Sequence, residues 1–93
     1  MNFTGYREVN VPELNLKMLA ALGKSELSKV DIASQLKTSS QTIDNSFVTF
    51  ESKREECITF KASDRIVCQV AKALGISLAI VETGVKRYFV KGK

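Results

Sequence analysis

Residues 29–48, KVDIASQLKTSSQTIDNSFV, decide the fold that we expect for this chain. Ile32, Ala33 and Leu36 share one face of a first helix, and Ile43 lies on the apolar face of a second helix, after a polar break. Two helices that cross at a steep angle need a residue without bulk where they touch, and Ala33 is such a residue. The segment therefore predicts two short helices joined by a tight turn.

The outer face of the second helix, about residues 39–48, carries short polar side chains. Gln41 and Asn45 can each bond adenine through paired donor and acceptor atoms. Asp44 would repel phosphate but could accept from a cytosine amino group, and Thr42 would face partly inward or touch a thymine methyl. The candidate DNA-contacting residues are Lys37, Ser39, Ser40, Gln41, Thr42, Asp44, Asn45, Lys53 and Arg54.

The spacing resembles the helix-turn-helix of the lambda-repressor-like (Cro/CI-type) DNA-binding regulators. The first helix of that motif has an apolar, a small and another apolar residue, and its second helix has a further apolar residue. Ile32, Ala33, Leu36 and Ile43 fit those positions. The phrase VAKALGISL, residues 70–78, also resembles the helix that closes the core of these regulators.

The resemblance implies that residues 39–48 form a recognition helix in the major groove of double-stranded DNA. Two positions depart from the family pattern. Lys37 stands where a turn glycine is usual, and Ser46 stands where a third buried apolar residue is usual. We expect Lys37 to adopt a left-handed backbone at some cost, and Phe47 or Phe50 to supply the missing apolar contact.

Composition excludes several other classes of protein. The 93 residues include no histidine, so a Ser-His or Cys-His catalytic pair is impossible, and we expect no enzyme and no catalytic residue. Two isolated cysteines, Cys57 and Cys68, cannot complete a zinc site, and we expect neither metal nor cofactor. No apolar run approaches the roughly 20 residues that cross a bilayer. The first residues lack the pattern of a secretory signal, which favours a cytoplasmic protein without a membrane partner.

The chain predicts a single mainly α domain over residues 1–93. We expect a compact helix-turn-helix fold of four to five helices, with short terminal strands or a small hairpin. Residues 1–11 would form an arm or strand, and residues 76–93 a C-terminal strand or tail. Asn10 predicts the start of a helix that stops at Gly23. The buried face of that helix is expected to hold Leu14, Met18, Leu19 and Leu22.

Local signals mark two more helix starts and leave one segment open. Ser28, followed by an acidic residue three positions on, predicts the first helix of the pair, and Ser63 predicts a late helix. Residues 48–60 have β-preferring ends around a charged stretch, so they could form a hairpin beside the second helix or a loop. Lys53 and Arg54 would lie at the tip and touch phosphate in either case.

The C-terminal segment ISLAIVETGVKRYFV, residues 76–90, could be a last helix or two strands, and its β-branched and aromatic content favours strands. Its apolar side chains exceed what a small core can hide. The net charge of +4 is concentrated near the C-terminus and favours a polyanionic partner. The helix pair itself is nearly neutral, so a monomer would bind DNA weakly. We therefore expect a homodimer or higher oligomer, with the tail Val85–Val90 or the first strand in the contact.

Two functions fit these observations. The first is a sequence-specific, DNA-binding transcription regulator, a small repressor or activator of the phage or plasmid type. The second is a small protein-interaction module, an inhibitor or assembly factor that binds no nucleic acid. Replacement of Gln41 and Asn45 would separate the two, because only DNA recognition needs both amides.

Overall fold

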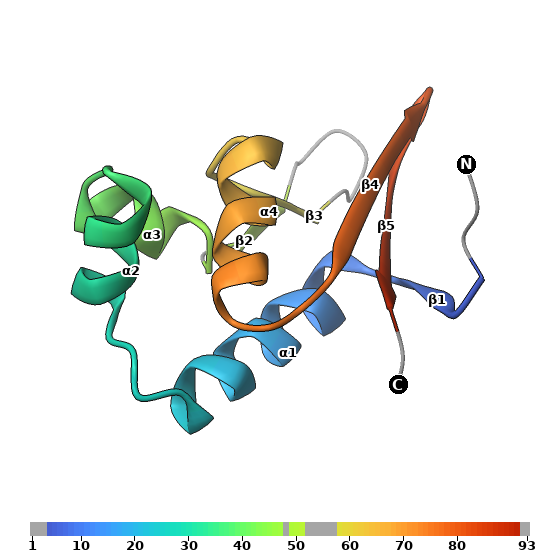
Figure 1. Cartoon of the computed structure of the whole chain (residues 1–93). Helices are drawn as coiled ribbons and strands as arrows, with labels where there is room; N and C mark the ends of the chain where they lie inside the picture. Colours follow the sequence, from blue (N-terminus) through green and yellow to red (C-terminus); the bar gives the residue numbers. More distant parts are fainter. Residues whose placement is uncertain (1–3, 48, 52–57, 92–93) are drawn as a thin grey trace.

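The computed structural model describes residues 4–47, 49–51 and 58–91. Within these residues the chain forms four helices and five strands (Figure 1). More residues are helical than extended, in agreement with the expected mainly α class. The elements are β1 (Tyr6–Val9), α1 (Val11–Lys24), α2 (Lys29–Leu36), α3 (Ser40–Asn45), β2 (Thr49–Glu51), β3 (Ile58–Phe60), α4 (Asp64–Ala73), β4 (Leu78–Thr83) and β5 (Val85–Lys91).

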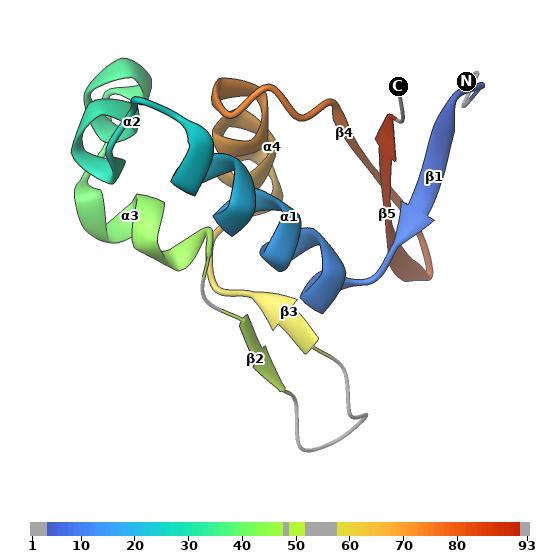
Figure 2. The same cartoon turned by 90° about the horizontal axis from the view of Figure 1, so that it is seen from below.

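The elements form three groups along the molecule. Helices α2 and α3 lie at one end and a three-stranded sheet lies at the other, with α1 and α4 between them (Figures 1 and 2). A two-stranded hairpin, β2–β3, follows directly after α3. None of the four helices is long and apolar enough to cross a membrane.

Polar caps start the helices where the sequence predicts them. The Asn10 side chain accepts from the N–H of Glu13 at 2.8 Å, which begins α1. Ser28 and Asp31 form a reciprocal capping box, in which each side chain accepts from the backbone N–H of the other residue. The hydroxyl of Ser63 accepts from the N–H of Ile66 at 3.4 Å, which begins α4. These three helix starts are confirmed, because the cap bonds satisfy backbone donors that the first helical turn leaves unpaired.

The C-terminal segment forms two strands, as its composition favours. Strands β4 and β5 turn at Gly84, whose φ of 91° suits glycine, and the sheet order is β1-β5-β4 with antiparallel pairs throughout. Strand β5 is therefore the central strand. Tyr88 and Val90 are buried in the core of their own chain. The expectation that the apolar tail Val85–Val90 exceeds what the core can hide is wrong for these two residues, because the face of the sheet that carries them packs into the core cluster.

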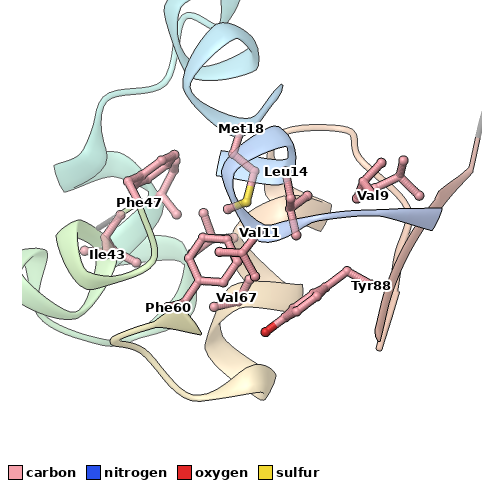
Figure 3. Close-up of a cluster of buried hydrophobic side chains, with 13 residues drawn as sticks. Val9, Val11, Leu14, Met18, Ile43, Phe47, Phe60, Val67 and Tyr88 are labelled. Carbon is pink, nitrogen blue, oxygen red and sulfur yellow. The ribbon is translucent and has the colours of Figure 1, made fainter. Parts of the chain in front are cut away.

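The core lies between α1, α3, α4 and the sheets. Leu14, Ile43 and Val67 are among its fully buried residues, and Figure 3 shows that side chains from these elements point toward one another. The ring of Phe60 from β3 meets the ring of Tyr88 from β5 edge to face, with 6.0 Å between the ring centres. This contact joins the hairpin to the three-stranded sheet through one continuous apolar cluster.

Of the two alternatives for residues 48–60, the structure contains the hairpin. Strand β2 pairs antiparallel with β3, so that Thr49 lies opposite Phe60. The two basic residues expected at the tip, Lys53 and Arg54, lie outside the described residues. Cys57 lies outside them as well.

Helix α1 differs from its prediction at its end and on one face. It continues one residue past Gly23, because Ser25 caps it with an extended backbone and an N–H that donates to the carbonyl of Leu22 at 3.2 Å. Leu19, expected in the core, is 40% exposed. Leu14 and Met18 already fill the buried face, and Leu22 packs at its margin.

Helix α3 is shorter than the expected recognition helix of residues 39–48. It ends at Asn45. The N–H of Ser46 donates to the carbonyl of Ile43, and the N–H of Phe47 donates to the carbonyl of Asp44. These bonds span three residues, so they tighten the last turn instead of extending the α-helix.

Candidate functional site

The turn between α2 and α3 is built around Lys37. Its φ of 56° and ψ of 47° place it in the left-handed region, and it is the one residue other than glycine with positive φ in the described part of the chain. The N–H of Lys37 donates to the carbonyl of Ser34, and the N–H of Thr38 donates to that of Ala33 at 2.9 Å. This pair of bonds forms a Schellman motif, in which the residue with the left-handed backbone is usually glycine. Lys37 thus adopts the left-handed backbone that we expected for this turn.

Small and buried residues bring the two helices together. Ala33 is buried where α2 meets α3, and Ile32 and Ile43 are fully buried beside it. Ser46, at the position where the lambda-repressor-like pattern has an apolar residue, is 0% exposed, and its hydroxyl donates to the carbonyl of Thr42 at 3.2 Å. The buried hydroxyl is therefore satisfied, and the buried ring of Phe47 adds the apolar contact expected there.

Two amide side chains project together from α3. Gln41 is exposed and Asn45 is half-buried, and the amide nitrogen of Gln41 donates to the amide oxygen of Asn45 at 3.3 Å. The two residues lie one helical turn apart, which places them on one face. Their donors and acceptors have the chemistry that reads adenine in the major groove. Ser40, one residue before Gln41, is also exposed.

Ser39 and Thr42 are engaged in capping α3. The hydroxyl of Ser39 accepts from the N–H of Thr42 at 3.2 Å, and the two hydroxyl oxygens lie 2.9 Å apart. Ser39 is exposed and Thr42 is half-buried, as expected for a side chain that faces partly inward. These hydroxyls fix the start of the helix, so they are less available to a ligand than Ser40 and Gln41.

Asp44 forms an ion pair within the helix pair. Its carboxylate accepts from the ammonium group of Lys29 at 2.7 Å, and that ammonium also lies 5.3 Å from the centre of the Phe47 ring. The carboxylate charge is thus compensated by a residue of α2, whose part in the site the sequence alone does not reveal. A direct bond from Asp44 to cytosine would require this ion pair to open.

A second basic segment lies close to the end of α3. The N–H of Ala62 donates to the carbonyl of Asn45 at 3.3 Å, which attaches the turn between β3 and α4 to the helix. Lys61 precedes this residue and Arg65 follows in the first turn of α4, and both side chains are exposed. Neither forms an ion pair with another described residue. The sequence alone does not indicate that Lys61 and Arg65 belong to the site, because their placement depends on the contact between the segment after β3 and the end of α3.

No cluster of three side chains that could hold a metal ion occurs among the described residues. Burial, with a smaller contribution from the charge of Asp64, raises the pKa of the Cys68 thiol. The raised pKa disfavours the thiolate, which is the reactive form of cysteine. The chain matches no known protein family, no curated protein and no solved structure.

Proposed function

We propose that this protein is a sequence-specific, double-stranded DNA-binding transcription regulator of the helix-turn-helix type, with α3 in the major groove. The observation that carries the proposal is the amide pair on one face of α3, in which Gln41 is exposed and Asn45 is half-buried. A packed pair of helices ending in a polar outward face is the arrangement in which side chains reach base edges. Each amide can bond one adenine through its paired donor and acceptor, which would supply sequence preference.

The hairpin and its return segment support the same function. Lys61 and Arg65 belong to the segment that Ala62 attaches to the end of α3, and they carry charges without an ion-pair partner among the described residues. Exposed lysine and arginine bind phosphate oxygens and fix the position of a protein on the duplex. Lys37, exposed in the turn that precedes α3, can do the same from the other side. Sequence reading by α3 and positioning by these cations would then be separate tasks.

A homodimer fits the charge of the helix pair. Lys29 and Asp44 neutralise each other, so one copy of the α2–α3 unit would displace few counterions from DNA and bind weakly. Two copies would double the phosphate contacts and read a two-fold site with half-sites about one turn apart. Strand β5 occupies the centre of its sheet, so an edge strand, β1 or β4, is the better contact between copies. Gel filtration with light scattering at micromolar concentration tests this, and a strict monomer at high concentration would contradict it.

Selection from random duplex DNA with the purified protein tests the function directly. An enriched, two-fold-symmetric sequence is the expected result. Gln41→Ala and Asn45→Ala should each weaken binding to that sequence by about 1–3 kcal/mol, while non-specific binding changes little. Gln35→Ala is the matched control, because Gln35 is an exposed amide on α2, before the turn.

Two results of these experiments would contradict the proposal. If selection enriches no sequence, or if the Gln41 and Asn45 variants bind the enriched site as tightly as the unchanged protein, then α3 does not read bases. The thermal midpoint of each variant should stay near that of the unchanged protein. A loss of folding would otherwise be mistaken for a loss of recognition.

One observation favours the second function, a protein-interaction module. Leu16 on α1 is 67% exposed, Leu19 is 40% exposed and Val30 on α2 is 64% exposed. Large exposed apolar side chains of this kind are typical of protein contacts when they form a patch. Under this reading Leu16→Ser and Val30→Ser abolish partner binding, and the Gln41 and Asn45 variants leave it intact. Under the DNA-binding reading the two serine variants keep full affinity for duplex DNA.

A further inference from the structure

A groove of about 830 Å³ lies between the second half of α1, the end of α4 and the end of β5. We call it the α1–β5 groove. Its floor is apolar and includes Leu74, Ile76 and the buried side chain of Val90. Three lysines, Lys17, Lys24 and Lys91, line it. Its size falls within the range of about 300–1,000 Å³ that is typical of small-molecule sites.

The charged side chains that line this groove are all basic. Among the residues that the structure describes, no aspartate or glutamate lines it. The described ion pairs use Arg7, Lys29, Lys86 and Arg87, whereas the three lysines of the groove take part in none of those pairs. The groove therefore combines an apolar floor with positive charge that no ion pair among the described residues compensates. An occupant that satisfies both features needs an apolar body and an anionic group.

The spacing of the cations on α1 suits such an occupant. Lys17 and Lys24 are seven residues apart, which is two helical turns, or about 10 Å along the same face. Ala20 and Ala21 lie between them and also line the groove, so no bulky side chain separates the two charges. Lys91 comes from β5, a different element from the other two lysines. An anion in the groove can thus meet cations from both elements.

The simpler explanation, that these lysines stabilise helix ends, accounts for one of them. Lys24 lies in the last turn of α1, where a cation interacts favourably with the helix dipole. Lys17 lies in the middle of α1, and Lys91 lies in a strand. The end of α4 is already closed by the N–H groups of residues 74–76, which donate to carbonyls of its last turn. Helix capping therefore leaves two of the three cations unexplained.

We propose that the α1–β5 groove binds a small organic anion with an apolar body, of the class of a medium-chain carboxylate. The apolar body covers Leu74, Ile76 and Val90, and the anionic group is held by the lysines. Ser25 also lines the groove, and its hydroxyl accepts from the N–H of Leu27 directly before α2. The occupant therefore contacts the segment that leads into the α2–α3 pair.

Titration of the full chain with octanoate, followed by NMR of the backbone amides, tests the proposal. Saturable shifts are expected for residues 17–25, 73–76 and 90–91. Octanol carries the apolar body alone and inorganic phosphate carries charge alone, so both should bind about tenfold more weakly than octanoate. Equal binding of octanol or of phosphate would overturn the proposal, as would shifts centred on Leu16 and Val30.

Charge reversal identifies the lysines. Lys17→Glu and Lys91→Glu should each weaken octanoate binding by about tenfold, because each removes a charge-assisted hydrogen bond. Lys72→Glu is the control: it reverses an exposed lysine of α4 that does not line the groove, and it should leave the affinity within about twofold. Equal effects of all three variants would mean long-range attraction without a site, and would overturn the proposal.

Duplex DNA is the competing occupant, since its phosphates also seek lysines. If a random duplex displaces octanoate, and if Lys17→Glu weakens the duplex and octanoate alike, the groove is a nucleic-acid surface and the proposal is wrong. Failure of the groove proposal would not affect the proposed recognition of DNA by α3, because none of the proposed DNA-contacting residues lines the groove. Failure of Gln41 and Asn45 to read bases leaves octanoate binding equally untouched.

Discussion

The ammonium group of Lys29 in α2 lies 2.7 Å from the carboxylate of Asp44 in α3, and 5.3 Å from the centre of the Phe47 ring. The pair therefore joins the two helices of the proposed DNA-binding unit across their turn. Both side chains are partly exposed, so the pair contributes little to stability. Its larger effect is on charge, because it compensates the one acidic group of α3.

Removal of Lys29 should expose that acidic charge to DNA. We expect Lys29→Met to weaken duplex binding, and Asp44→Asn in the same chain to restore most of it. Neither change should lower the free energy of unfolding by more than about 1 kcal/mol. Fluorescence anisotropy with a labelled duplex at low salt measures both effects. If Lys29→Met and the double variant bind equally weakly, Lys29 itself contacts phosphate and its pairing with Asp44 is incidental.

Replacement of Lys37 by glycine should stabilise the protein. Lys37 has a left-handed backbone, which costs a residue with a Cβ roughly 1–2 kcal/mol, and glycine avoids this cost at the expense of a more flexible unfolded chain. The expected net gain for Lys37→Gly is about 0.5–1 kcal/mol in urea denaturation. Lys37→Ala keeps the Cβ and removes the charge, so it should give no such gain. A gain with alanine would show that charge, not backbone strain, limits stability.

The helix starts were predictable from the sequence because each depends on neighbouring residues. Asn10, Ser28 and Ser63 meet their N–H partners three positions along the chain. The turn at Lys37 was predictable as well, although only from the resemblance, since a lysine alone does not indicate a left-handed backbone. Signals of this local kind survive without knowledge of the tertiary structure.

The features that the sequence left open depend on contacts between distant residues. The apolar content of the tail predicts more side chains than one small core can hide, yet β5 lies at the centre of a sheet in which Val9 of β1 pairs with Tyr88, and both residues belong to the core. The exposure of Gln41 followed from the polar face of α3. The ion pair that compensates the charge of Asp44 was not predictable in this way, because Lys29 is fifteen residues away and reaches Asp44 only after the two helices pack. Periodicity can identify a face but not its partner.

Replacement of Ser46 by the apolar residue that the lambda-repressor-like pattern has at this position should destabilise the protein. Its side chain is fully buried and its hydroxyl already donates to the carbonyl of Thr42. Ser46→Leu would overpack this site, so we expect a loss of about 1–3 kcal/mol in urea denaturation. Ser40→Leu, on the exposed face of the same helix, should cost less than about 0.5 kcal/mol. A stable Ser46→Leu variant would mean that the helix pair has room that the described packing lacks.

The capping box of α2 should make stability depend on pH. The backbone N–H of Ser28, and then its hydroxyl, bond the carboxylate of Asp31 and lower its pKa below the ordinary value of 3.8. A carboxylate with a lowered pKa in the folded state contributes stability above its ordinary pKa, and this contribution disappears as the pH falls through the lowered value. Thermal midpoints of the unchanged protein and of Asp31→Asn should therefore differ at neutral pH, and they should converge only as the pH falls from 3.8 through the lowered pKa of Asp31. The Glu8–Arg87 pair, whose carboxyl pKa is also lowered by hydrogen bonding to Arg87, is present in both chains and cancels in the comparison. A difference that persists unchanged at low pH would mean that Asp31 acts through its shape and not through its charge.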